Sequence, residues 1–134
     1  MKLTEREIVG CLMRENRRLD LSRVEDWMFW DKELRKLFSA LLSADSSLKE
    51  NLVKLREITG VRASTVADMS MLGDNIRWGQ HPVLQVDIDN WVDAKYIELI
   101  KKHTASGSIG KIQQILNKMQ EPPDKGVIER YEEY

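Results

Sequence analysis

Apolar residues recur at helical spacing through most of residues 1–120, and this periodicity limits the possible folds more than any other feature of the chain. From Asp31 onward they follow the i, i+3, i+4, i+7, i+8 pattern of one helix face, and Asp31 itself can cap that helix. The positions concerned are Leu34, Leu37, Phe38, Leu41 and Leu42. No segment shows the alternation of β-branched and polar residues that is typical of a strand. The sequence therefore predicts an all-α fold.

Residues 1–86 are expected to form a small helical head. Thr4 and Glu7 have the spacing of a capping box, which predicts that a first helix begins there. Its apolar stripe consists of Ile8, Val9, Leu12 and Met13. A short helix is expected around Leu21 and Val24, before the helix that Asp31 caps.

Two more helices are expected in the second half of the head. Apolar residues at helical spacing over 48–58 mark one of them, which Gly60 would close. Ser64 opens a shorter helix that is expected to end at Gly73. The stretch 74–86 contains a glycine and a proline and is expected to be an irregular loop.

Residues 87–120 are expected to form an antiparallel helical hairpin. Asp87 can cap its first helix, Thr104 to Ser108 would break that helix, and an apolar stripe resumes at Ile109. The first arm carries apolar side chains on more than one face, so it must bury them against its own domain or against another chain. Residues 121–134 contain five Asp or Glu against two Lys or Arg and are interpreted as an acidic tail or the start of a linker.

Patterns that would indicate catalysis or a metal site are missing from the sequence. Residues 107–112 imitate a phosphate loop, but the glycines are too close together and Ile112 stands where a Ser or Thr should bind Mg²⁺. His81 and His103 are not joined to carboxylates at metal-ligand spacing. Cys11 lies in an apolar helix and is expected to be a small core residue. We therefore expect no catalytic residue, no cofactor and no metal.

The charge balance argues against nucleic acid and membrane surfaces as partners. The chain has 21 Lys+Arg and 22 Asp+Glu, and the net charge of -1 attracts neither DNA nor an anionic bilayer. No apolar stretch reaches the roughly 18 residues that are needed to span a bilayer. The single cysteine is consistent with a reducing compartment. These observations predict a cytoplasmic protein with no membrane contact and with little or no direct binding to DNA.

The four tryptophans divide into two groups. Trp27 and Trp30 flank Met28 and Phe29, and this aromatic cluster is expected to lie in the core. Trp78 in the expected loop and Trp91 on the hairpin are better interface candidates, because tryptophan is favoured in contacts between proteins. Trp78 is the candidate for binding a partner.

Three groups of residues occur in the order found in a known family. They are Glu5 with Ile8-Val9-Gly10-Cys11-Leu12-Met13 and Asn16; Phe29-Trp30 with Leu37-Phe38; and Asp87-Ile88 with Trp91. Together they resemble the amino-terminal domain of the hexameric, DnaB-type replicative DNA helicases, over roughly residues 4–42 and 86–118. Leu34 stands where the family often has His, and the middle of the chain departs from the family pattern. The divergence resembles that of a phage or mobile-element member.

The resemblance implies a non-catalytic interaction and oligomerisation domain that functions in DNA replication. In the family, hairpins from two subunits pack together, and three such dimers form a collar that contacts primase and helicase-loader proteins. A linker then leads to the ATPase motor. By this resemblance, the surplus apolar surface of the hairpin pairs two copies of the chain. The residues expected at this interface are Trp91, Ile97, Ile100, Ile112 and Ile115.

Two alternatives stay open. The helicase-binding domain at the carboxyl end of bacterial primase resembles the same head and hairpin, although Gly10 and Asn16 favour the helicase. The chain also has the size of a standalone phage adaptor or inhibitor that binds the replication machinery of its host.

Overall fold

A computed structural model describes residues 2–14 and 19–119. These residues form seven α-helices and one 3-10 turn and include no strand, which confirms the all-α prediction. The expected acidic tail, 121–134, lies outside the described residues, as does Asn16. The chain divides into two compact units, Met1–Ile88 and Asp89–Tyr134.

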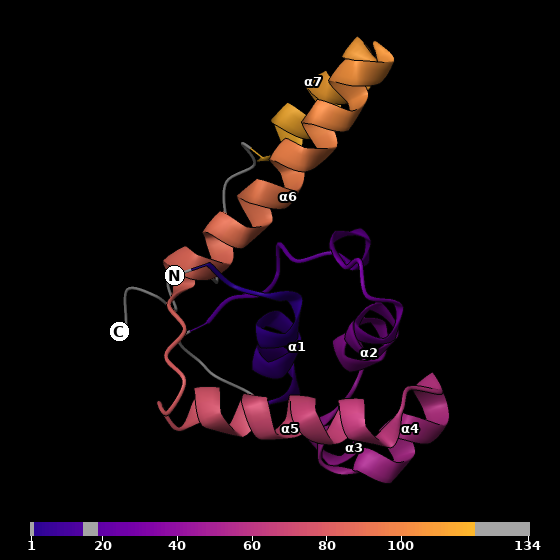
Figure 1. Cartoon of the computed structure of the whole chain (residues 1–134), viewed down its shortest axis with the longest axis vertical. Coiled ribbons are helices and arrows are strands. Elements are labelled where there is room, and N and C mark those ends of the chain that lie inside the picture. The colour runs from indigo at the N-terminus through magenta and orange to yellow at the C-terminus, as the bar shows by residue number, and fades with distance from the viewer. Residues whose placement is uncertain (1, 15–18, 120–134) are drawn as a thin grey trace. The chain divides into compact units, whose positions relative to one another are not determined.

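The first unit is the helical head, and the second contains the hairpin (Figure 1). The helices that lie wholly in the head are α1 (Glu5–Met13), η1 (Asp26–Met28), α2 (Lys32–Leu42), α3 (Ser46–Glu50), α4 (Leu52–Thr59) and α5 (Ala63–Arg77). Helix α6 (Gln85–Ser106) starts in the head and provides the first arm of the hairpin, and α7 (Ile109–Met119) returns alongside it.

Side-chain caps start α1 and α2 where the sequence predicted them. The hydroxyl oxygen of Thr4 accepts from the backbone N–H of Glu7, while the Glu7 carboxylate accepts from the N–H of Thr4, which completes the capping box of α1. The carboxylate of Asp31 accepts from the N–H groups of Glu33 and Leu34 at 2.9 and 3.2 Å. Gly60 ends α4 with a φ of 69°.

The sequence suggested that the helix now labelled α5 ends at Gly73. In the structure it continues to Arg77. Gly73 is buried in the middle of the helix because α1 passes directly over it. A Cβ on Gly73 would lie 2.5 Å from the carbonyl oxygen of Gly10, so the two backbones approach closely only because Gly73 has no side chain. The loop that follows is correspondingly short, 78–84 instead of 74–86.

Two other predictions about the head are wrong in detail. The helix expected over 48–58 is divided into α3 and α4, because the Asn51 side chain accepts from the N–H of Lys54 and thereby caps a new helix start. The short helix expected around Leu21 and Val24 is a turn, closed by a 3.0 Å bond from the Val24 N–H to the Leu21 carbonyl, and the 3-10 turn η1 follows it.

The hairpin has longer helices and a tighter turn than expected. Asp87 lies in the first turn of α6 and does not precede the helix; its carboxylate accepts from the N–H of Leu84 at 3.1 Å. Thr104 stays helical, and its hydroxyl donates to the Ile100 carbonyl. The turn therefore consists of Gly107 and Ser108 alone, and the φ of 74° at Gly107 reverses the chain.

Aromatic residues form part of the head core, but fewer of them than expected. The rings of Phe29 and Phe38 lie 4.8 Å apart, and Phe29 and Met28 are fully buried. Trp30, in contrast, is 79% exposed, and Trp27 is only partly buried. Trp30 precedes the cap of α2, where its backbone N–H donates to the Glu5 carboxylate and its side chain points away from the core.

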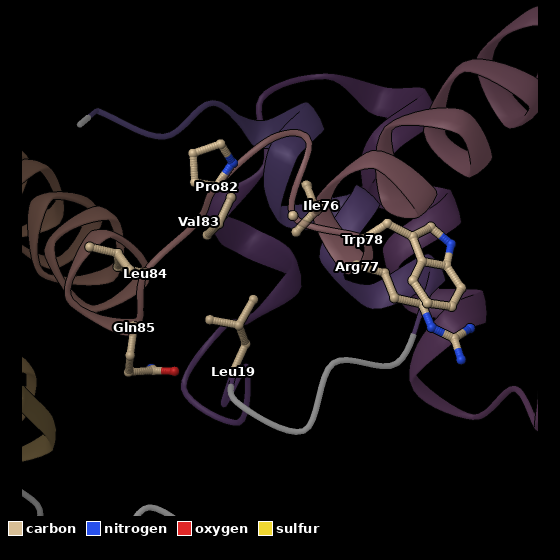
Figure 2. Close-up of a pocket in the computed structure, with 9 residues that line it drawn as sticks. Leu19, Ile76, Arg77, Trp78, Pro82, Val83, Leu84 and Gln85 are labelled. Carbon is tan, nitrogen blue, oxygen red and sulfur yellow. The ribbon is translucent and has the colours of Figure 1, made fainter. Parts of the chain in front are cut away.

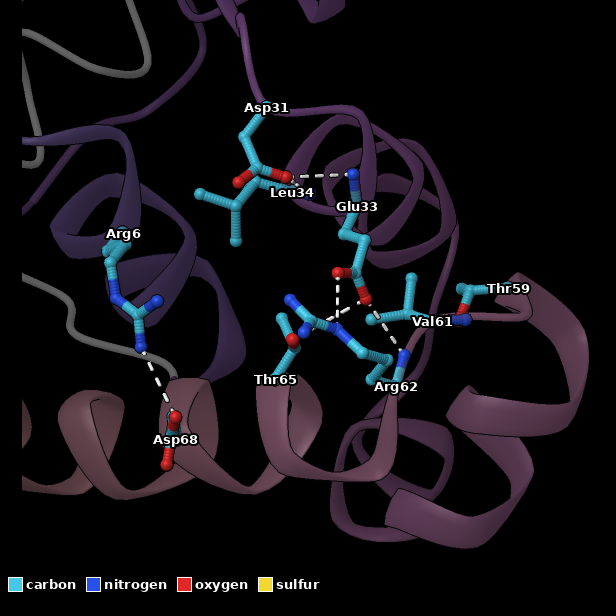
Figure 3. A network of polar contacts seen from close by, with 9 residues as sticks. All are labelled: Arg6, Asp31, Glu33, Leu34, Thr59, Val61, Arg62, Thr65 and Asp68. Atoms are coloured by element: carbon cyan, nitrogen blue, oxygen red, sulfur yellow. Dashed lines mark hydrogen bonds and ion pairs between the residues drawn. The ribbon is translucent and has the colours of Figure 1, made fainter.

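Polar side chains connect α5 to α1 and to α2 (Figure 3). Glu33 on α2 accepts from the backbone N–H of Arg62 at 2.9 Å and from its Nε at 2.7 Å, which ties α2 to the residue that precedes α5. These bonds lower the pKa of the Glu33 carboxyl below its usual value. Arg6 on α1 forms an exposed ion pair with Asp68 on α5.

Arg14 joins three parts of the head at the end of α1. Its Nε donates to Asp74 at 2.9 Å and its Nη2 donates to the Ser70 hydroxyl at 2.7 Å, both on α5. Its Nη1 donates to the carbonyl of Lys49 on α3 at 3.1 Å. A planar guanidinium satisfies these three directions together, which a lysine ammonium would not do.

The two glycines at the α1–α5 crossing are expected to respond differently to alanine. At Gly73 the new Cβ would meet backbone, and the resulting overpacking, about 1–3 kcal/mol, should exceed the gain of about 1 kcal/mol in helix propensity. At Gly10 the new Cβ would lie 3.1 Å from Cγ of Leu72 and 3.3 Å from the backbone nitrogen of Gly73, which is a milder overlap than the 2.5 Å at Gly73. Urea unfolding followed by circular dichroism should therefore show a larger loss of stability for Gly73→Ala than for Gly10→Ala. The reverse order would contradict this account of the crossing.

Candidate functional site

The five hairpin residues predicted to pair two copies differ in their exposure. Trp91 and Ile115 are buried, and Lys95 Nζ lies 5.2 Å from the centre of the Trp91 ring. Ile100 and Ile112 are half-buried, and Ile97 is 47% exposed. A contact of these residues with a second copy stays a prediction.

The hairpin also exposes apolar residues that the sequence analysis did not assign to an interface. Ile109 is 79% exposed, and Leu116 is exposed as well. On an α-helix, positions three and four apart share a face, so Ile109, Ile112 and Leu116 lie along one side of α7. Their spacing in the sequence indicates that they share a helix face. The sequence does not reveal which residues of that face the fold leaves exposed to solvent.

Trp78 stands beside a groove of about 620 Å³ in the head (Figure 2). Its side chain is 70% exposed, and the Arg77 guanidinium lies 5.1 Å from the ring centroid, in the range of a cation–π contact. The groove is lined by Leu19, Ile76, Arg77, Trp78, Gly79, Pro82, Val83, Leu84 and Gln85. The sequence singled out Trp78 alone, because the other lining residues come together only through the tertiary fold.

Backbone and amide hydrogen bonds fix the walls of this groove. Gly79, with a φ of 78°, turns the chain after α5, and the N–H groups of Gln80 and His81 both donate to the Asn75 carbonyl. Across the groove, the Gln85 side chain accepts from the Asp20 N–H at 2.7 Å and donates to the Asp20 carbonyl at 3.0 Å. These bonds join the start of α6 to Asp20, the residue next to Leu19.

His81 and Cys11, which the sequence offered as candidates for metal binding or catalysis, have structural roles. His81 Nε2 lies 2.6 Å from the carboxylate of Glu7, which is buried and also closes the α1 capping box. Cys11 is buried as expected, and burial, together with the nearby charge of Glu7, raises the pKa of its thiol to about 12. In the described part of the chain, no group of three or more His, Cys, Asp and Glu is placed to hold a metal ion.

Residues 107–112, which resemble a phosphate loop in sequence, form the hairpin turn and the start of α7. Gly107 forms the hairpin turn, as its positive φ requires, and the residues after Ser108 form the first turn of α7. Lys111 is exposed on that helix. His103 lies in the last turn of α6, where a basic residue interacts favourably with the helix dipole.

The Glu7 carboxyl should make the stability of the head sensitive to acid. Burial raises its pKa, but hydrogen bonds from His81 and Thr4 more than offset burial, and the net pKa lies below its usual value of 4.5. A lowered folded pKa stabilises the fold above pH 4.5, and this stabilisation is lost as the pH falls through the folded pKa. Compared by urea unfolding at several pH values, wild type should be more stable than Glu7→Gln at neutral pH, and the difference should vanish on acidification.

A matched control for this titration is Glu57→Gln, at an exposed position on α4. Its effect should be small and should not vary with pH in the same way. A difference between wild type and Glu7→Gln that grows as the pH falls would contradict the role assigned to the pair.

Among the described helices, none combines the length and the apolar character that a membrane span requires.

The chain was compared with protein families, with curated proteins and with solved structures. No protein-family model matches the chain, and neither the curated proteins nor the solved structures include a significant match to it.

Proposed function

We propose that this chain is a non-catalytic oligomerisation and docking domain, of the kind implied by its resemblance to DnaB-type replicative helicases. The observation that carries the proposal is the apolar surface that the hairpin leaves exposed. Ile109 and Leu116 on α7 and Ile97 on α6 are exposed, and Ile112, on the same side of α7 as Ile109 and Leu116, is half-buried. Aliphatic side chains exposed on two joined helices are typical of surfaces that pack against another protein.

Several of the residues that carry the resemblance have roles in building the fold, which supports the proposal. Gly10 takes part in the close crossing of α1 and α5, and Phe29 packs against Phe38 in the core. Asp87, in the first turn of α6, accepts a hydrogen bond from the N–H of Leu84, which precedes the helix. In the proposed assembly, hairpins pair two copies, three dimers form a hexamer in the full-length protein, and the head docks primase or a helicase loader.

The proposed dimer is isologous, so each hairpin presents the same residues to its partner. Burial of an aliphatic side chain contributes roughly 1.5–3 kcal/mol, and association costs several kcal/mol in lost freedom. Because Ile100 and Ile112 are already half-buried in one copy, each gains less than the full amount. The affinity of the isolated domain is therefore expected to be micromolar.

A charge on the hairpin surface should separate the dimer without unfolding the chain. Ile100→Glu or Ile112→Glu would place a carboxylate in the apolar contact, and the head should keep its helical structure because it has its own core. Sedimentation should show wild type dimerising toward about 100 μM, a concentration above a micromolar dissociation constant. The two variants should stay monomeric, with an unchanged circular dichroism spectrum.

The control is Gln114→Glu, which adds the same charge to α7 at an exposed position about 200° around the helix from Ile112. This variant should dimerise like wild type. A wild-type chain that is monomeric under these conditions would refute the dimer, as would unfolding of Ile100→Glu, since the hairpin stripe would then belong to the intramolecular core.

The absence of a complete phosphate loop predicts that the purified chain does not hydrolyse ATP. The glycine spacing and Ile112 both depart from the motif, so no residue is expected to hold the Mg²⁺ of a bound nucleotide. A phosphate-release assay should give the same signal with and without the protein. Turnover that Lys111→Ala abolishes would contradict the non-catalytic assignment.

A further inference from the structure

We propose that the groove beside Trp78 binds a short acidic segment of a partner protein, with an aliphatic anchor in the groove and neighbouring carboxylates on Arg77. The inference rests on the proposed function, because it names the chemistry of the partner that the head would dock. It assigns this docking to one surface of the head. The experiment that tests this surface does not depend on whether the hairpin forms a dimer.

The groove has the size and the walls that an aliphatic anchor requires. Its volume, about 620 Å³, falls within the roughly 300–1,000 Å³ of typical ligand-binding pockets. Pro82, Val83 and Leu84 line it from the loop before α6, and Leu19 and Ile76 complete its apolar lining (Figure 2). Leu84 and Trp78 are both largely exposed, so a docked side chain would cover apolar surface that now faces water.

Arg77 gives the surface its charge preference. It lines both this groove and a second hollow of about 170 Å³. The second hollow is lined by Met13, Arg14, Ser46, Lys49, Glu50 and Arg77, which supply three cations and one carboxylate. Arg14 is already paired with Asp74, whereas Arg77 stacks on Trp78 with its guanidinium at the edge of the groove. Aliphatic lining residues beside the Arg77 guanidinium complement a segment in which aliphatic and acidic residues adjoin.

The surface is also preformed, which favours binding. The paired hydrogen bonds between Gln85 and Asp20 hold one side of the groove. The Asn75 carbonyl, which accepts from two successive N–H groups, holds the other. Little of the binding free energy of a partner segment would therefore be lost in ordering the groove.

Two labelled peptides test the inference by fluorescence anisotropy. Both carry the same central pair of leucines, flanked by glutamates in one peptide and by lysines in the other. The acidic peptide is expected to bind the wild-type chain about tenfold more tightly, as one partly desolvated ion pair would allow. This preference should shrink at high salt, because the ions screen the pair. Equal binding of the two peptides would overturn the proposal.

Variants of the groove locate the binding. Arg77→Glu should abolish the preference for the acidic peptide or reverse it, and Trp78→Ala should weaken the binding of both peptides. Arg77→Gln, which removes the charge without reversing it, provides a second test if Arg77→Glu does not fold. The matched controls are Arg56→Glu and Trp30→Ala, at exposed residues outside the groove, and neither should change the affinity. If the controls weaken binding as much as the groove variants do, the groove is not the site.

The experiment separates this inference from the proposed dimer. A chain that sediments as a monomer but prefers the acidic peptide would refute the hairpin interface and support the groove. A chain that dimerises but binds both peptides equally would keep the oligomerisation domain and refute the acidic docking segment.

Discussion

The close approach of α1 and α5 is the contact on which the head depends. Gly73 has no side chain, and the two backbones meet where a Cβ would not fit. At this separation Arg14 can reach Asp74 on α5, and the Glu7 carboxylate can reach His81 just beyond the end of α5. A wider crossing would lengthen both of these polar contacts together, so the order of the loop beside the groove depends on the packing of two backbones.

The sequence predicted the features of the fold that local interactions determine. The caps at Thr4 and Asp31 act within one helical turn, and they occur as expected. Gly73 was interpreted as a helix end because glycine is common there, but its role is set by α1, which is distant in sequence. Asn51 shows a local ambiguity, since an asparagine within an apolar repeat can be tolerated inside a helix or can cap a new one.

The candidate surfaces were only partly predictable, because periodicity identifies apolar faces and not what covers them. Trp30 was expected in the core and is exposed, whereas Trp78 was singled out as an interface candidate and does stand beside a groove. Leu84 and Arg77 gave no signal in the sequence, since their importance comes from what the fold brings next to them. Ile109 belonged to a recognised stripe, but its exposure depends on how α7 is rotated in the hairpin.

The two-residue turn between α6 and α7 has a consequence for how this chain tolerates insertions and deletions. A residue inserted next to Gly107 lengthens a turn at which an added Cβ would meet no atom within 4 Å. A residue inserted inside α7 turns everything after it by about 100° around the helix axis. Leu116 would then leave the side that it shares with Ile109 and Ile112. The exposed face of the hairpin is thus encoded in the length of the segment between Gly107 and Leu116, and substitutions that keep this length and the apolar character leave that face intact.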